Sequence, residues 1–143
     1  MKRSRRRPRL GVTGGGRGIV NHAGARLLAD VADAVGLTEG LSAAMAPTRE
    51  RAGGHDRGEV LVDLAVMIAD GGETFSDLAA LADQPGVFGR VASVPTAWRT
   101  LAAVDGPALE RIAGVDPGFY VMDFDATRQP IPPHHNCLLK DLG

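Results

Sequence analysis

Apolar residues recur with helical spacing through the middle of the chain. Leu27, Val31 and Val35 are spaced four residues apart after Ala23, which predicts a first helix that Gly36 ends. Later segments repeat the arrangement of a capping residue followed by an apolar stripe. Five further helices are therefore predicted, with starts near Thr38, Asp56, Thr74, Ser93 and Asp105.

The same spacing predicts which side of each helix faces a core. The residues expected to face inward are Leu27, Leu28, Val31, Ala32 and Val35 in the first helix, Val60, Leu61, Leu64, Met67 and Ile68 in the third, and Trp98, Leu101 and Ala102 in the fifth. Aromatic residues make up only 4% of the chain. Because a core of Ala and Leu suits close-packed helices better than a β-sandwich, we expect a mainly α fold.

Both ends of the chain depart from the helical pattern. Glycines dominate residues 10–20, which predicts a hairpin with two short strands. Residues 119–124 (FYVMDF) form a short apolar run typical of a buried strand, and three prolines then exclude regular structure at 130–133. We expect four segments: a basic tail at 1–9, a helical region at 10–113, one strand at 118–127 and an irregular tail at 128–143.

The glycine stretch VTGGGRGIV is similar to the phosphate-binding turn of short-chain dehydrogenases. Such a turn needs a buried apolar strand before it and a closing glycine, but the chain has RRRPRLGV and Val20. The Tyr-x-x-x-Lys pair of those enzymes is missing as well, since Phe124 stands four residues after Tyr120. A nucleotide-binding oxidoreductase fragment is therefore the least favoured alternative.

Charge is distributed unevenly along the chain. The first nine residues hold six of the sixteen basic residues and no acidic residue: Lys2, Arg3, Arg5, Arg6, Arg7 and Arg9. The remaining chain carries ten basic against seventeen acidic residues, a net charge of −7. A basic arm on an acidic body is typical of a tail that binds nucleic-acid phosphates, and a solvated terminus without a partner is the alternative.

The predicted fourth and fifth helices are adjacent and short, which favours a helix-turn-helix. Thr96, Arg99 and Thr100 are expected outside the apolar stripe of the second of these helices, with Arg90 just before it. Such side chains suit contacts in the major groove of DNA. The linking loop, about 84–94, exceeds the usual length, so a small helical bundle with a solvated face remains the alternative.

Two carboxylates follow the predicted strand in the sequence DFDAT. Asp123 and Asp125 are expected on one face of the strand because side chains alternate along it. Oxygen ligands of this kind suit Mg²⁺ or Mn²⁺, and paired ions of this type assist phosphoryl transfer. One strand supplies only part of such a ligand set, and an aspartate pair that caps a turn is the alternative interpretation.

The remaining candidate residues give weaker indications of a functional site. His134, His135 and Cys137 form a possible metal cluster, but their proline-rich surroundings give it no scaffold. A single cysteine allows no internal disulfide, and no apolar run is long enough to cross a bilayer. From these features we expect a soluble, cytoplasmic protein with no membrane or small-molecule partner.

Three phrases resemble the bacterial insertion-sequence transposases of the DDE class, in the group numbered thirteen-eighty. They cover about residues 19–104 and 120–127, and read NHAGARLLADVADAVGLT, GHDRGEVLVDLAVMIADGGETFSDLAALADQPGVFGRVASVPTAWRTL and YVMDFDAT. The resemblance implies a helical region that recognises transposon-end DNA, followed by the first strand of an RNase H-like domain. It also implies that Asp125, with Asp123 as the alternative, is the first metal-binding carboxylate for DNA strand cleavage.

The chain departs from that family after this strand. The second aspartate and the glutamate of the family lie far downstream, whereas Glu110 is the last glutamate here. We therefore expect an inactive N-terminal transposase fragment that binds DNA and holds no Mg²⁺ or Mn²⁺ stably. The alternative is a small helical module that pairs with itself or with an intact transposase.

Overall fold

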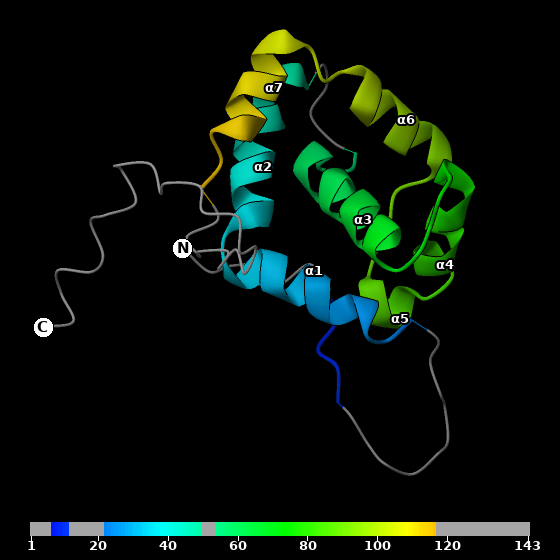
Figure 1. Cartoon of the computed structure of the whole chain (residues 1–143). Helices are drawn as coiled ribbons and strands as arrows, with labels where there is room; N and C mark the ends of the chain where they lie inside the picture. The colour runs from blue at the N-terminus through cyan, green and yellow to red at the C-terminus, as the bar shows by residue number, and fades with distance from the viewer. Residues whose placement is uncertain (1–6, 12–21, 50–53, 117–143) are drawn as a thin grey trace, which may run out of the picture.

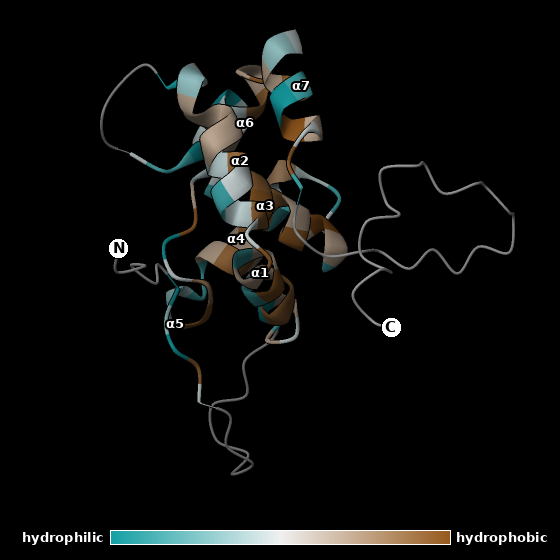
Figure 2. Cartoon of the chain, turned by 90° about the vertical axis from the view of Figure 1, so that its left-hand side faces the viewer, coloured by the Kyte–Doolittle hydropathy of each residue, from teal (hydrophilic) through white to brown (hydrophobic). Residues whose placement is uncertain are grey.

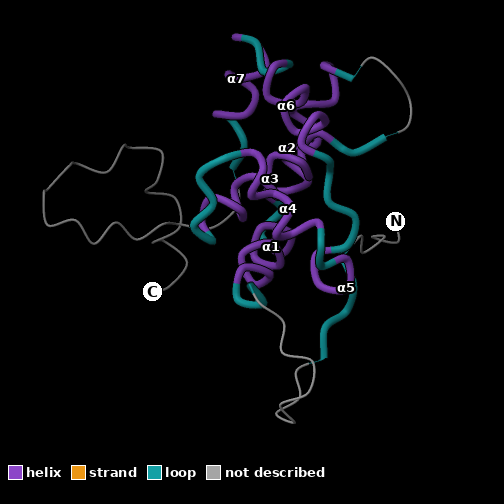
Figure 3. The backbone as a smooth tube through the Cα atoms, turned by 90° about the vertical axis from the view of Figure 1, so that its right-hand side faces the viewer, coloured by secondary structure: helices purple, strands orange, loops and turns teal. Residues whose placement is uncertain are grey.

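The computed structural model describes residues 7–11, 22–49 and 54–116, and within these ranges it contains helices and loops but no strand (Figure 3). The predicted mainly α fold is confirmed for this part of the chain. The α-helices are α1 (Ala25–Ala34), α2 (Leu37–Met45), α3 (Arg57–Ala69), α4 (Ala79–Ala82), α5 (Pro85–Phe88), α6 (Val94–Ala102) and α7 (Gly106–Ala113). Two 3-10 helices accompany them, η1 (Ala46–Thr48) and η2 (Phe75–Leu78).

Helix α3 lies at the centre of the molecule. Helices α1, α2 and α6 pack around it, and α7 packs against α2 on the outside (Figure 1). The largest fully buried side chains belong to Met45, Val60, Leu78 and Leu81, which come from α2, α3, η2 and α4. The core therefore joins segments from both halves of the described chain.

Capping side chains begin several of these helices where the sequence predicts. The Asp56 carboxylate accepts hydrogen bonds from the backbone of Gly58 and Glu59 at 2.9 and 3.3 Å. Thr74 and Asp77 form the reciprocal capping box of η2. Asp105 accepts from the Ala108 backbone at 2.8 Å at the start of α7. These confirmed starts depend on local bonds, which the spacing of residues is sufficient to predict.

The start of α2 differs from the prediction that Thr38 caps it. Helix α2 begins at Leu37 directly after Gly36, whose φ of +80° is one that side-chain-bearing residues rarely adopt. The Thr38 hydroxyl instead donates to Asp33 at 2.6 Å, back across the turn. A single left-handed residue therefore separates α1 from α2.

Gly58 allows α2 and α3 to approach each other closely. A Cβ atom at this position would overlap the backbone of Ser42 and Leu41. The Ser42 hydroxyl also donates to the Asp56 carboxylate at 2.6 Å, so the cap of α3 is tied to α2. This seam has no room for a side chain at residue 58.

The predicted orientation of α1 is wrong for its large apolar residues, although Ala32, which was also expected to face inward, is buried. Its large apolar residues face outward, with Leu27 66%, Leu28 46% and Val31 52% exposed, whereas Ala29 and Arg26 are buried. Hydrophobic and hydrophilic residues alternate along this outer helix (Figure 2). Because the buried side chain of Ala29 is small, the backbone of α1 can lie close to its neighbours on this side of the helix.

In α3, Val60, Leu64 and Met67 are buried as expected, but the rest of that stripe and the predicted inner face of α6 need correction. Ile68 of α3 is 64% exposed, while Val62 and Val66, absent from the predicted stripe, are buried. In α6, Trp98 is 62% and Leu101 41% exposed, and Ala102 is exposed as well. Ala97 and Thr100 are the residues of α6 that face the core.

Four sequence predictions lie outside the described residues. They are the four basic residues before Arg7, the glycine-rich hairpin (of which only residues 10 and 11 are described), the strand at 118–127 and the tail at 128–143 with its His and Cys residues. Among the helices that the structure describes, none is long and apolar enough to cross a membrane.

Candidate nucleic-acid interface

Helix α6 is preceded by a short helix rather than by a simple turn. The sequence predicts a turn at 84–86, but Pro85 instead begins α5, where its missing N–H costs nothing. Val87 and Phe88 of α5 are buried, and Gly89, with φ of +80°, then changes the chain direction. Two short helices, α4 and α5, therefore lie between η2 and α6.

Polar side chains from both ends of α6 are linked to one another. The Ser93 and Thr96 hydroxyls are 3.1 Å apart, and the Arg99 guanidinium donates to the Thr96 hydroxyl at 3.2 Å. Arg99 and Ser93 are exposed and Thr96 is half-buried. Ser93 and Thr96 lie at the N-terminal, positive end of the α6 dipole, and Arg99 reaches back to them from the last turn, so the helix presents donors and positive charge to solvent.

Arg90 adds a second cation just before α6. It is exposed, and its charge acts on the imidazole of His55, which precedes α3. Partial burial and, after it, the Arg90 charge lower the pKa of His55. The imidazole is therefore neutral near pH 7, and Arg90 rather than His55 carries the positive charge here.

Thr100 does not project outward as the sequence predicts. It is only 2% exposed, and its hydroxyl donates to the Thr96 carbonyl at 3.0 Å inside α6. This back-bond satisfies a polar group that faces the core. Thr100 therefore has a structural place in the described fold, and we do not assign it to the interface.

The remaining outer surface of α6 is apolar. Trp98 packs edge-on against Phe75 of η2, with ring centroids 5.2 Å apart and planes at 74°, yet it stays 62% exposed. Leu101 and Val94 are 41% and 37% exposed on the same helix. Helix α6 thus exposes a mixture of cationic, hydroxyl and apolar groups.

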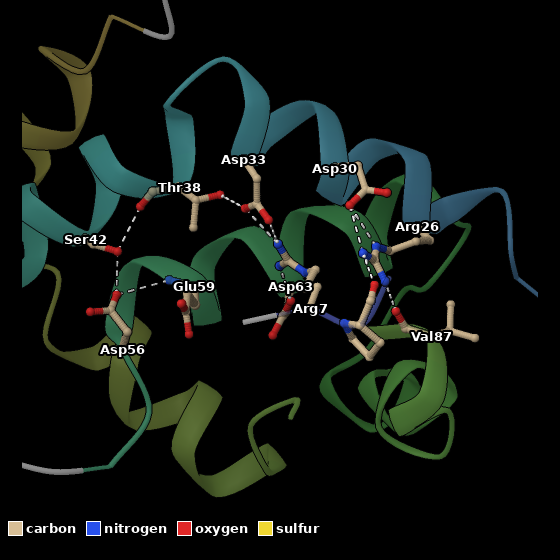
Figure 4. A network of polar contacts seen from close by, with 11 residues as sticks. Arg7, Arg26, Asp30, Asp33, Thr38, Ser42, Asp56, Glu59, Asp63 and Val87 are labelled. Atoms are coloured by element: carbon tan, nitrogen blue, oxygen red, sulfur yellow. Dashed lines mark hydrogen bonds and ion pairs between the residues drawn. The ribbon is translucent and has the colours of Figure 1, made fainter. Parts of the chain in front are cut away.

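Arg7, predicted to contact nucleic acid, is bound internally. Its guanidinium donates to both Asp33 oxygens at 2.8 Å and to Asp63 at 2.9 Å, which ties the N-terminal segment to α1 and α3 (Figure 4). Arg9 is exposed. Lys2, Arg3, Arg5 and Arg6 precede the described residues. The described part of the basic tail therefore contains one arginine that is bound internally, Arg7, and one that is exposed, Arg9.

Asp63, the buried partner of Arg7, was not among the residues predicted for the site. Burial raises the pKa of Asp63 to about 6, although the hydrogen bond and charge of Arg7 act to lower it. Hydrogen bonds and the charges of Asp63 and Asp33 raise the pKa of Arg7 despite burial, which acts against them as the largest single influence. A carboxylate inside the apolar run VLVDLAV was the available sign that a cation must lie nearby.

No metal centre occurs in the described residues, where no three His, Cys, Asp or Glu side chains converge to form one. The predicted ligands Asp123 and Asp125 lie outside those residues.

Comparison with known proteins identifies the class. The family model described as "Transposase DDE domain group 1" matches residues 2–131, which is most of the chain. The chain belongs to this family of DDE transposases. Members generally use divalent metal ions, and DNA is the partner that such a family implies. No curated protein and no solved structure matched the chain.

Proposed function

We propose that this chain contains the DNA-binding helical region of an insertion-sequence transposase, in the group numbered thirteen-eighty. The observation that carries this proposal is the family match over residues 2–131, which covers every described helix. In this assignment the domain boundaries are those expected from the sequence: a basic tail at 1–9, a DNA-binding region at 10–113 and the start of an RNase H-like domain at 118–127.

Helix α6 is the proposed recognition helix of a helix-turn-helix-like unit, preceded by η2, α4 and α5. Its exposed Arg99, its Thr96 and Ser93 hydroxyls, and Arg90 before it provide the support. Arginine side chains and a helix N-terminus bind phosphates, and hydroxyls bind phosphates or base edges. The basic tail adds positive charge that does not depend on DNA sequence.

The proposal assigns DNA binding, and not strand cleavage, to these residues by themselves. Asp125, or Asp123, would contribute one metal ligand, and no glutamate follows Glu110 in this sequence. A divalent ion would supply the Lewis acid and the activated water for cleavage. Incubation of the chain with duplex DNA and Mg²⁺ should therefore yield no nicks. Nicking that Asp125→Asn abolishes would contradict this assignment.

Fluorescence anisotropy with a labelled duplex tests the DNA-binding role. The dissociation constant should rise steeply with salt, and Arg90→Ala or Arg99→Ala should each reduce the salt slope by about 1. Arg49→Ala is the matched control, because Arg49 is exposed at the end of η1 and pairs with Asp56. Loss of binding in the control alone, or equal loss in all three variants, would contradict the assignment to α6.

Exposed apolar groups on α6 favour a second candidate function. Trp98, Leu101 and Val94 resemble the centre of a protein interface more than a DNA-binding surface. This alternative is a module that binds itself or an intact transposase. Trp98→Ala separates the two functions. If α6 binds proteins, the substitution should abolish self-association in sedimentation and leave DNA affinity unchanged. If α6 enters a groove of DNA, the substitution should weaken DNA affinity.

A further inference from the structure

Trp98 is the single tryptophan of the chain, and its ring lies at the surface of α6. The residue is 62% exposed, whereas large aromatic rings usually remove much of their apolar area from water. It meets the ring of Phe75 at 74°, with the ring centroids 5.2 Å apart. An edge-on contact of this kind covers at most one of the two faces of an indole. At this exposure, a flat apolar face of Trp98 is therefore accessible from solvent.

Phe75 gives the exposed ring a firm support. It is half-buried and packs against the hydrophobic core. Helix α6 in turn packs against η2, which contains Phe75, and against α3 (Figure 1). Because a T-shaped pair favours one arrangement of its two rings, Trp98 loses little conformational freedom when a ligand covers it.

The outer side of α6 combines this ring with a cation. The helical period places four exposed residues opposite the buried pair Ala97 and Thr100, namely Pro95, Trp98, Arg99 and Ala102. Pro95 and Ala102 lie between Trp98 and Arg99 around the helix, and both have small side chains. A flat group can therefore reach the indole while an anionic group next to it contacts the guanidinium.

A nucleotide with an unpaired base carries both of these groups. Its base has a flat face that stacks on an aromatic side chain, and its phosphate accepts hydrogen bonds from an arginine. In a closed duplex the neighbouring bases cover each face, and only the base edges reach the grooves. The pairing of Trp98 with Arg99 thus suits DNA whose bases are open better than a closed duplex.

We propose that Trp98 stacks on an unpaired base, and that α6 thereby binds single-stranded or locally opened DNA in preference to closed duplex. This inference rests on the proposed DNA-binding function, and it adds the form of DNA that α6 selects. Arg99 binds a phosphate beside the stacked base, and Phe75 is a positioning residue that holds the indole. The exposed ring, which a reader of closed duplex does not need, is then covered by the bound strand.

Fluorescence of Trp98 reports stacking directly, because the chain has no other tryptophan. The probes are an oligothymidylate of about ten nucleotides, within the usual size of such sites, and an abasic oligonucleotide of the same length. The two carry equal numbers of phosphates and differ only in their bases. We expect the oligothymidylate to quench Trp98 and to bind about tenfold more tightly than the abasic probe. A duplex with a bulge of unpaired thymines should likewise bind more tightly than the same duplex with an abasic bulge.

Variants separate stacking from attraction by charge. Trp98→Leu keeps an apolar side chain without the ring, and should bind the two oligonucleotides equally in fluorescence anisotropy, whereas Trp98→Phe should keep most of the preference. Arg99→Ala should weaken both probes by the same factor, because it removes a phosphate contact. The matched control Leu27→Ala shortens an apolar side chain that is 66% exposed on α1, and should change neither affinity. Circular dichroism checks that each variant keeps its helix content.

Three results would overturn the inference. Equal affinity of the unaltered chain for the oligothymidylate and the abasic probe would show that α6 binds phosphates alone, and would leave the proposed DNA-binding function intact. Trp98 fluorescence that changes with protein concentration in the absence of DNA, together with dimers in sedimentation, would assign the ring to a protein interface. Absence of binding to every probe and to duplex at low salt would refute the proposed function, and the stacking role with it.

Discussion

Helices α1 and α3 lie side by side but bury different kinds of residue. Helix α3 buries Val60, Val62, Leu64 and other residues on several sides, as expected for a central helix. Helix α1 buries Ala25, Ala29, Ala32 and the charged Arg26, and exposes its larger apolar side chains. The amphipathic pattern is clearer in α1 than in α3, yet its large apolar residues face outward, so periodicity identifies a stripe without showing which way it faces.

The difference has a physical basis in the contacts between the two helices. Alanines let the α1 backbone approach α3 closely, and the polar atoms of Arg26 are satisfied by carbonyls and Asp30 instead of water. We conclude that the seam between α1 and α3 is stabilised by small residues and buried ion pairs, and the rest of the α3 surface by valine and leucine packing.

The largest expected effect tests the ion pairs of the seam. Arg7→Ala leaves the buried Asp63 without its cation and should lower the free energy of unfolding by about 4 kcal/mol at pH 7. At pH 5 the loss should be smaller, because Asp63 becomes protonated. Urea unfolding at both pH values measures this. Arg9→Ala, an exposed control, should change stability by less than about 0.5 kcal/mol, and an equal loss would show that the pairs are unimportant.

A pair of leucines tests the contrast between the helices directly. Leu64→Ala in α3 removes a side chain that is 6% exposed and should cost about 3 kcal/mol. Leu27→Ala in α1, where the side chain is 66% exposed, should cost less than about 0.5 kcal/mol. Thermal or urea unfolding gives both numbers. Similar losses would mean that α1 buries the stripe predicted from the sequence.

Gly58 offers a test of the neighbouring seam between α2 and α3. Gly58→Ala should cost about 2 kcal/mol, because its Cβ would overlap the Ser42 backbone, which cannot move without shifting a helix. The matched control is Gly86→Ala, where the new Cβ meets open space. Urea midpoints should fall for the first variant only, and a drop for both would point to backbone freedom instead of close approach.

The smallest expected effect concerns pH and the charge of Asp63. The folded state raises the pKa of Asp63 to about 6 from an ordinary value of 3.8, so it binds more protons than the unfolded state between these values. The contribution of Asp63 to stability therefore increases as pH falls from 7 to 5, by about 1 kcal/mol. The unaltered chain should therefore gain about 1 kcal/mol of unfolding free energy relative to Asp63→Asn between pH 7 and pH 5, because the asparagine does not titrate. A difference that does not vary with pH would contradict the raised pKa.

Helix existence and helix starts were predictable because they depend on residues three or four positions apart. Asp56, Thr74 and Asp105 cap their helices as the spacing indicates. The inward faces of α1 and α6 were not predictable from periodicity, since they depend on which neighbour each helix meets. The short helix α5 was missed because Pro-Gly is as common in turns as at the first turn of a helix.

The candidate site could be predicted only in part, because local sequence indicates exposed cations but not contacts between distant residues. Arg90 and Arg99 are exposed, as surface cations near a short helix generally are, whereas Thr100 turns inward to a bond within its own helix. The roles of Arg7 and Asp63 depend on contacts 56 residues apart in sequence, which no local pattern encodes. The place of Asp123 and Asp125 in a metal site stays a prediction.

The contact between Val115 and Gly40 has a consequence for how the protein is assembled. A Cβ at residue 40 would lie 2.5 Å from Cγ1 of Val115, so the absent side chain leaves a notch on α2 in which the valine is seated. This close fit holds Val115, which follows α7, against α2. A side chain at residue 40 would force these two segments of the described chain apart.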